Sequence, residues 1–311
     1  MYLTICRHNI LHSQTYRHMN STTLSFILII IMVLAMACKS KVSSQDNNSV
    51  PTIINQDSIP THNNHKQISE TEESVFFEYD SIKYNDISQT VINPNYILYI
   101  SDLDQNFEIK KTDFDIEPLG YRNTNYQRFY IHFDSVYKSD KNSYVAIGRT
   151  RYRDTIRSFE GIITLDSAST AHSTDISRSV GIAFVSLYGH YCFIEDSTTN
   201  ASGKIYGNVE YDCIIKNGQL LYDTDGIDYS DTYKNRQYAG QWIAHNGNRT
   251  EPCNWGDFRI PNSKEFDIGA GIFFPTDEYS DNGWQLYKAR FYEYSQTTYD
   301  EYMKDSKWWN K

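Results

Sequence analysis

The sequence lacks the signatures of most enzymes and nucleic-acid-binding proteins. It has no Gly-x-Ser-x-Gly, no His-Glu-x-x-His and no catalytic Cys and His grouping, so the common hydrolase motifs are absent. It has no basic run of five or more residues, and 29 Lys and Arg face 39 Asp and Glu. Because a phosphate-binding surface needs a basic stripe, nucleic acid is excluded as a partner.

Cysteine is also scarce. Beyond residue 38 the chain has only Cys192, Cys213 and Cys253, which allows at most one internal disulfide. In a regular hairpin Cys192 faces about Tyr206, and Cys213 then lies roughly 24 Å away along the strand. We therefore expect no Cys192–Cys213 bond and favour reduced or buried thiols. Because no Cys-x-x-Cys pair exists and no His is spaced to complete one, zinc is disfavoured.

The longest apolar run, Leu24 to Ala37, has 14 residues. It is too short for the roughly 20 residues of a membrane-spanning helix but suits a signal peptide. The run ends in Ala-Met-Ala before Cys38, and Lys-Ser-Lys follows. This pattern resembles the lipobox of bacterial lipoproteins, which implies cleavage before Cys38 and a diacylglyceryl group on that cysteine. The alternatives are an ordinary secretory signal or an uncleaved anchor, and translation from Met19 is also open.

These features predict a signal peptide over 1–37, a lipidated disordered linker over 38–74 and a β-rich domain over 75–311. The linker has no aromatic residue from Lys39 to Ser74, so it cannot bury enough apolar area to offset its ordering entropy. The residue after Cys38 is Lys39, whereas an Asp at that position would resemble an inner-membrane retention signal. We therefore expect a lipid anchor in the cell envelope, in the outer membrane rather than the inner, and not a cytoplasmic protein.

Composition predicts an all-β domain. The chain has 26 Tyr and 15 Phe but only 7 Pro, and aromatic residues suit half-buried pleated surfaces. Arg128 to Tyr137 alternates strictly, which predicts a strand with one buried face. Ser143 to Tyr152 runs back with Val145 and Ile147 inward, and Ile156 to Leu165 completes a meander.

Further strands follow a polar loop expected from Asp166 to Arg178. An Asn-Gly turn at 217–218 indicates a hairpin. The predicted strands are Val180–Glu195, Gly203–Lys216, Gln219–Tyr222, Gln237–His245 and Trp284–Tyr294. About eight or more antiparallel strands need a barrel or a two-sheet sandwich to hide their edges. Residues 75–120 form either a separate subdomain or additional strands.

Glycines that follow aromatic residues within the strands favour the barrel. Together with Gly240-Gln241-Trp242, this pattern resembles the calycins, which implies an antiparallel barrel. At the other end of the domain, Thr297 to Lys311 is expected to be a short helix whose Trp308 and Trp309 dock on the body. The alternative is that these two aromatic residues are exposed for a partner.

The segment Cys253 to Pro261 is expected to be a turn that carries a ligand-binding site. A Trp face beside an acid and an Arg suits a sugar ring and its hydroxyls, so a glycan or an envelope protein is the expected partner. The candidate residues are Trp255, Asp257, Arg259 and Trp242. The favoured alternative is a corner in which Trp255 fills one end of the core and Asp257 pairs with Arg259 or Arg290.

Two acidic groups suggest other chemistry. The first is a set of four carboxylates that could supply oxygen ligands for calcium: Asp223, Asp225, Asp228 and Asp231. Their spacing is not that of an EF-hand. The alternative is a solvated acidic loop, and no other cofactor is expected. The second set is expected on two neighbouring strands and comprises Glu195, Asp196, Glu210 and Asp212. A glycosidase uses a pair of carboxylates about 5 to 10 Å apart, but among 39 acids such pairs also arise by chance, and Glu195 alternatively ends a strand. We therefore expect a ligand- or partner-binding lipoprotein, with a carbohydrate-active enzyme or a structural envelope component as alternatives.

Overall fold

The computed structural model describes residues 85–94, 97–100, 107–110, 116–170, 182–224, 232–292 and 295–310. They form antiparallel β structure with few helices. The strands are β1 (Ile97–Ile100), β2 (Phe107–Lys110), β3 (Leu119–Arg122), β4 (Gln127–Asp140), β5 (Ser143–Tyr152), β6 (Thr155–Thr170), β7 (Ile182–Glu195), β8 (Gly203–Lys216), β9 (Gln219–Tyr222), β10 (Asn235–Ala244) and β11 (Thr250–Asp257). Within these ranges, no helix has the length and apolar character needed to cross a membrane.

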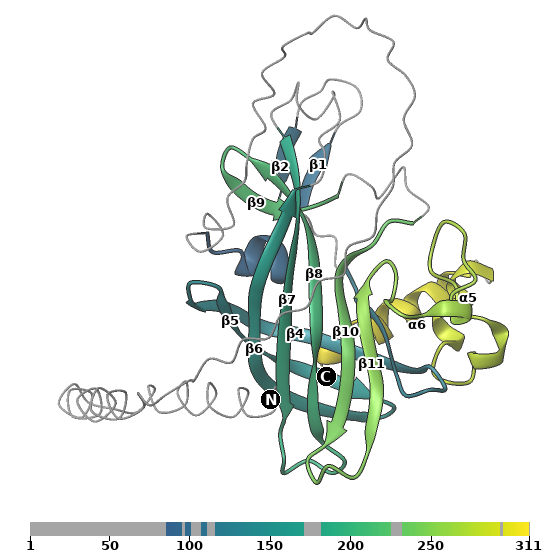
Figure 1. Ribbon diagram of the computed structural model, residues 1–311. Helices are drawn as coiled ribbons and strands as arrows, with labels where there is room; N and C mark the ends of the chain where they lie inside the picture. The colour runs from purple at the N-terminus through teal and green to yellow at the C-terminus, as the bar shows by residue number, and fades with distance from the viewer. Residues whose placement is uncertain are drawn as a thin grey trace, which may run out of the picture. The chain divides into compact units, whose positions relative to one another are not determined.

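Nine strands form one sheet that closes on itself (Figure 1). Its order is β10-β11-β3-β4-β5-β6-β7-β8-β9, and β10 also pairs with β8. The long strand β8 therefore pairs with β10 over its first part and with β9 over its last part. Asn217 and Gly218 join β8 to β9 with φ of 52° and 76°, as the predicted tight turn requires. The all-β prediction is confirmed, in its barrel form.

Side chains fill the interior of the barrel. Along β7, Leu187, Tyr191 and Phe193 alternate inward and are at most 1% exposed. The π-helix η1 (Ser88–Ile92) adds Val91 and Ile92 to the same core cluster. Because the interior is packed in this way, the fold argues against a ligand held inside the barrel.

The meander β4-β5-β6 has the predicted order, but its inward face differs. Val145 and Ile147 do not face the barrel core as predicted, because Phe133 of β4 pairs with Gly148 and turns the even-numbered residues of β5 toward the core. Val145 is nevertheless buried, at 3% exposed. A Cβ at Gly148 would lie 2.7 Å from the ring of Phe159. Small residues face inward to make room for that ring. Strand β6 also continues to residue 170, into the region predicted as a polar loop.

The chain after β11 is helical rather than extended. The helices are η2 (Lys264–Phe266), η3 (Asp277–Tyr279), α5 (Gln285–Tyr292), α6 (Gln296–Ser306) and η4 (Trp308–Asn310). The strand predicted over 284–294 is therefore wrong. Trp284, Tyr287 and Phe291 recur at helical spacing and pack in a second aromatic core. These aromatic residues have a high strand propensity, but their packing in this core favours the helix.

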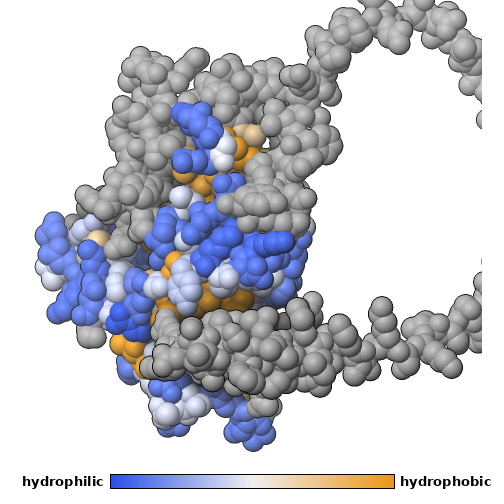
Figure 2. Space-filling view, turned by 90° about the vertical axis from the view of Figure 1, so that its left-hand side faces the viewer, coloured by the Kyte–Doolittle hydropathy of each residue, from blue (hydrophilic) through white to orange (hydrophobic). Residues whose placement is uncertain are grey.

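The C-terminal helix docks on the outer face of β4, as predicted. Trp308 is 1% exposed, and Trp309 stacks on His132 with ring centroids 4.2 Å apart. The expectation that only one face of β4 is buried is wrong at the start of this strand. Arg128 and Tyr130 are buried on its outer face, where Tyr130 donates a hydrogen bond to Asp305 at 2.8 Å. On the face shown in Figure 2, hydrophilic residues predominate, and hydrophobic ones occupy smaller areas between them.

Candidate functional site

The segment predicted to be a ligand-binding turn is mostly a strand. β11 continues to Asp257, and the turn begins only at Phe258. Because residues alternate along the strand, Trp255 and Asp257 both point inward and are 1% and 0% exposed. Trp255 stacks on Tyr238 in the core, with ring centroids 4.7 Å apart. The predicted turn surface is therefore not formed by these two residues.

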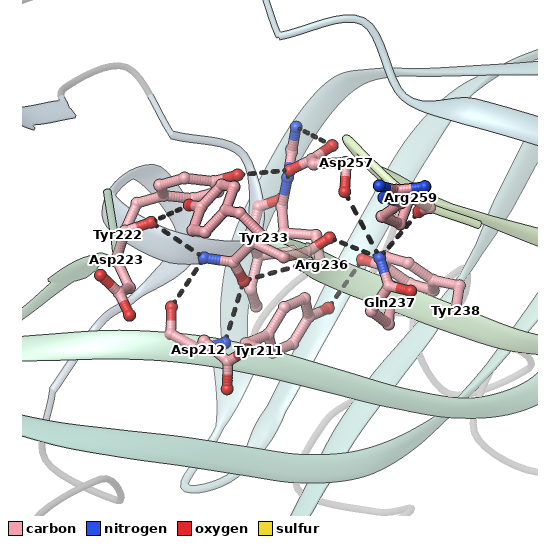
Figure 3. Close-up of polar contacts among 12 residues, drawn as sticks. Tyr211, Asp212, Tyr222, Asp223, Tyr233, Arg236, Gln237, Tyr238, Asp257 and Arg259 are labelled. Carbon is pink, nitrogen blue, oxygen red and sulfur yellow. Dashed lines mark hydrogen bonds and ion pairs between the residues drawn. The ribbon is translucent and has the colours of Figure 1, made fainter. Parts of the chain in front are cut away.

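Asp257 is held by a buried network (Figure 3). Its carboxylate accepts hydrogen bonds from Nε and Nη2 of Arg236 at 2.5 and 3.0 Å and from the hydroxyl of Tyr222 at 2.9 Å. The pairing of Asp257 with Arg259 or Arg290 is thus a wrong prediction. Burial raises the pKa of Asp257, and the Arg236 guanidinium partly offsets this effect. These protein donors occupy the carboxylate, which indicates a structural role.

Trp242 lies in the same hydrophobic core as Trp255 but makes its polar contacts with other residues. Its Nε1 donates to the carboxylate of Glu195 at 3.0 Å. That carboxylate also accepts from the Thr150 hydroxyl at 2.6 Å and the Gly203 amide at 2.9 Å. The guanidinium carbon of Arg122 lies 3.4 Å from the Trp242 ring centroid. Trp242 and Asp257 therefore have different polar partners, and neither side chain is exposed to form a common binding surface.

The pairing of β7 with β8 keeps Glu195 and Glu210 apart. The strand pairing places Glu195 beside the start of β8, about seven residues from Glu210 or roughly 24 Å. A glycosidase pair is separated by about 5 to 10 Å. Asp196 lies in the following turn, and Asp212 accepts a hydrogen bond from Ser186 at 2.6 Å. The geometry thus gives Glu195 no catalytic partner on β8.

The predicted calcium site falls mostly outside the described residues, since only Asp223 lies within them. The backbone carbonyl of Asp223 accepts hydrogen bonds from Tyr233 and Asn235. In the parts of the chain that the structure describes, no group of three or more His, Cys, Asp or Glu is arranged to hold a metal ion. Calcium binding by this loop stays a prediction for Asp225, Asp228 and Asp231.

An open groove runs over the outer face of β8, β10 and β11. It consists of two adjoining cavities of about 640 and 620 Å³, and Asn208, Ala239 and Asn262 line both of them. Strand pairing builds its floor, because Ala239 of β10 lies opposite Asn208 of β8 on one side and Asn254 of β11 on the other. The short side chain of Ala239 leaves the floor low between larger polar neighbours.

The turn after β11 forms a wall of this groove. Arg259 lines the second cavity and donates to Asp267 at 2.6 Å and to the carbonyl of Gly269 at 3.0 Å. Phe258 and Asn262 have φ of 63° and 59°, so the chain bends sharply between them. Of the four predicted ligand-binding residues, Arg259 is the one that lines this groove.

Sequence reasoning missed the residues of the groove floor. Asn208 and Asn254 are far apart in the chain, and only the closure of the barrel places their strands, β8 and β11, on the two sides of β10. The sequence does show polar residues alternating with apolar ones along these strands, which predicts that the polar ones point outward. That signal identifies a solvent-facing surface but not a concave one.

The cysteine prediction is confirmed only in part. The expectation of a reduced thiol is wrong for Cys192, which is disulfide-bonded. Cys192 pairs with Tyr206 across β7 and β8, and no bond joins it to Cys213. Cys213 and Cys253 are free and fully buried. Burial raises the pKa of both thiols, so neither is ionised at neutral pH.

No known protein family, curated protein or solved structure matches this chain. The function is therefore inferred from the N-terminal sequence pattern and from the geometry of the groove.

Proposed function

We propose that this protein is a bacterial envelope lipoprotein that is held to a membrane by lipid on Cys38 and binds a ligand or partner in its outer-face groove. The observation that carries the binding role is the groove itself. Its two adjoining cavities of about 640 and 620 Å³ have the size of small-molecule sites. A filled barrel interior counts against a ligand inside the barrel, so the proposed binding role depends on the outer-face groove alone.

The anchoring role is supported by the apolar run that ends at Cys38. Two acyl chains hold a protein stably, because each buried methylene adds about 0.8 kcal/mol of membrane affinity. The composition of the 36 residues from Lys39 to Ser74 predicts a flexible coil, and coil scaling gives such a linker an r.m.s. span of roughly 30 to 36 Å. Such a tether lets the groove reach a ligand beyond the lipid headgroups.

The anchoring role is tested with Cys38→Ser in cells that are labelled with a palmitate analogue and then fractionated. We expect Cys38→Ser to lose the label and the membrane association, and the control Cys6→Ser to keep both. Equal labelling and fractionation of parent and Cys38→Ser would refute the anchor. Mass spectrometry that finds Cys38 in a disulfide with Cys192 would also refute it, because that thiol is then not acylated.

The binding role is tested by photo-crosslinking in intact envelopes. A photoreactive residue replaces Asn262, which is exposed and lines both cavities. The matched control replaces Tyr137, an exposed residue of β4 outside both cavities. We expect an adduct of a glycan or an envelope protein at position 262 and none at 137. The absence of any adduct specific to position 262 would overturn the binding role.

A further inference from the structure

The first cavity of the groove is lined mainly by neutral polar groups. Its carboxamides include those of Asn208, Gln241 and Asn262, and its charged lining residue is Lys264. A carboxamide offers two donors and an acceptor in one plane, which suits neighbouring hydroxyl groups of a ligand. The exposed carboxamide of Asn208 forms no hydrogen bond with another residue of the described chain, so it is available to a ligand.

The charges of the second cavity are balanced within the protein. Lys234 lies 3.5 Å from Glu210, and Arg259 is paired with Asp267. Asp166 lies 2.8 Å from a ring nitrogen of His190. Because these charges have partners of their own, and because the whole chain carries a net charge of -10, the second cavity does not favour an anionic ligand.

An aromatic side chain lies at the same place. Tyr188 of β7 lines the second cavity and is 38% exposed. The pairing of β7 with β8 sets Tyr188 opposite Glu210, two residues along from Asn208 on the same outer face. An exposed ring beside amide and carboxylate groups covers the apolar face of a sugar while the polar groups bind its hydroxyls.

We propose that the groove binds a neutral oligosaccharide, with Tyr188 stacking on one sugar ring and Asn208 binding its hydroxyls. The two adjoining cavities accommodate an extended chain rather than a single sugar. This inference rests on the proposed binding function of the same groove and names the ligand class.

The test is calorimetric titration of the full-length protein in detergent micelles. The probes are three neutral hexasaccharides, maltohexaose, cellohexaose and chitohexaose, and one acidic comparator, hexagalacturonate. We expect at least one neutral probe to bind, and Tyr188→Ala and Asn208→Ala each to weaken it about tenfold, which corresponds to about 1.4 kcal/mol. The matched control is Tyr137→Ala, because Tyr137 is also 38% exposed but lies outside both cavities. It should leave the Kd unchanged.

Thermal unfolding of each variant shows whether a change in the Kd reflects lost contacts or lost folding. Neutral binding that survives both Tyr188→Ala and Asn208→Ala overturns the inference, as does binding of hexagalacturonate alone. If no hexasaccharide binds while position 262 still forms its adduct in envelopes, the oligosaccharide inference fails and the proposed binding function stands. If both tests are negative, both fail.

Discussion

Replacing Asp257 by Asn would test whether the buried ion pair with Arg236 stabilises the barrel. The substitution keeps the shape of the side chain but removes its charge. Asp257 is fully buried and the Arg236 side chain is 7% exposed, so the guanidinium would lose its counter-charge inside the core. Its hydrogen bond to the carbonyl of Ile92, at 3.2 Å, does not compensate for a full charge.

Removal of one partner from a buried pair lowers the free energy of unfolding by about 3–5 kcal/mol. For a folded part of this size, each kcal/mol shifts the Tm by about 2–4 °C, so Asp257→Asn should lower the Tm by about 6–20 °C. Urea unfolding followed by tryptophan fluorescence measures the change, because Trp255 is buried two residues away along β11.

The matched control is Asp134→Asn, since Asp134 also pairs with an arginine, Arg149, at 2.6 Å. Both side chains of that pair are about one third exposed, so its loss should cost at most about 1 kcal/mol. If Asp257→Asn lowers the free energy of unfolding by no more than this control, the reasoning about the buried pair is refuted.

Other predictions concern pH, thiol reactivity and packing. Burial raises the pKa of Asp305, but hydrogen bonds such as that from Arg151 lower it by more, to below its ordinary value of 3.8. An ionised Asp305 with a lowered pKa stabilises the folded state above about pH 4, and this stabilisation is lost as the pH falls. Acid should therefore release α6, which hydrogen exchange would detect. Asp305→Asn should remove this pH dependence. Cys213 and Cys253 should react with a thiol reagent only after unfolding in urea, as peptide mass spectrometry would show. Gly240→Ala should lower the free energy of unfolding by about 1–3 kcal/mol in urea titrations, because its Cβ would lie 2.2 Å from a carbonyl oxygen of β8.

Each of these predictions has a clear contrary outcome. Protection of α6 that does not change between pH 6 and pH 2 would show that Asp305 does not hold this helix. Labelling of Cys213 in the folded protein would mean that its thiol is accessible. If Gly240→Ala were as stable as the parent, β8 and β10 would have room to separate without cost.

The strands were largely predictable because their signals are local. The alternation of Phe129, Ile131 and Phe133 along β4 and the Asn-Gly turn after β8 are properties of neighbouring residues. Which side chains of β5 point toward the core was not predictable. It depends on the register against Phe133 and on the space that Phe159 needs, and both are contacts between strands.

The same distinction explains the error over residues 284–294. Trp284, Tyr287 and Phe291 have the residue types of a strand but the spacing of a helix, and the second aromatic core selected the helix. Docking of this core against β3 and β4 also buried Arg128, a residue that sequence patterns assign to the surface.

By itself, the sequence determined the all-β class, the hairpin at 217–218 and the expectation of a lipid anchor, because each depends on residues close together in the chain. Only the tertiary structure decided that Asp257 faces Arg236 and that Ala239 lies between Asn208 and Asn254. The physical reason is that hydrogen bonds between strands set which distant residues become neighbours. A shift of one residue in that register would turn the groove floor toward the core.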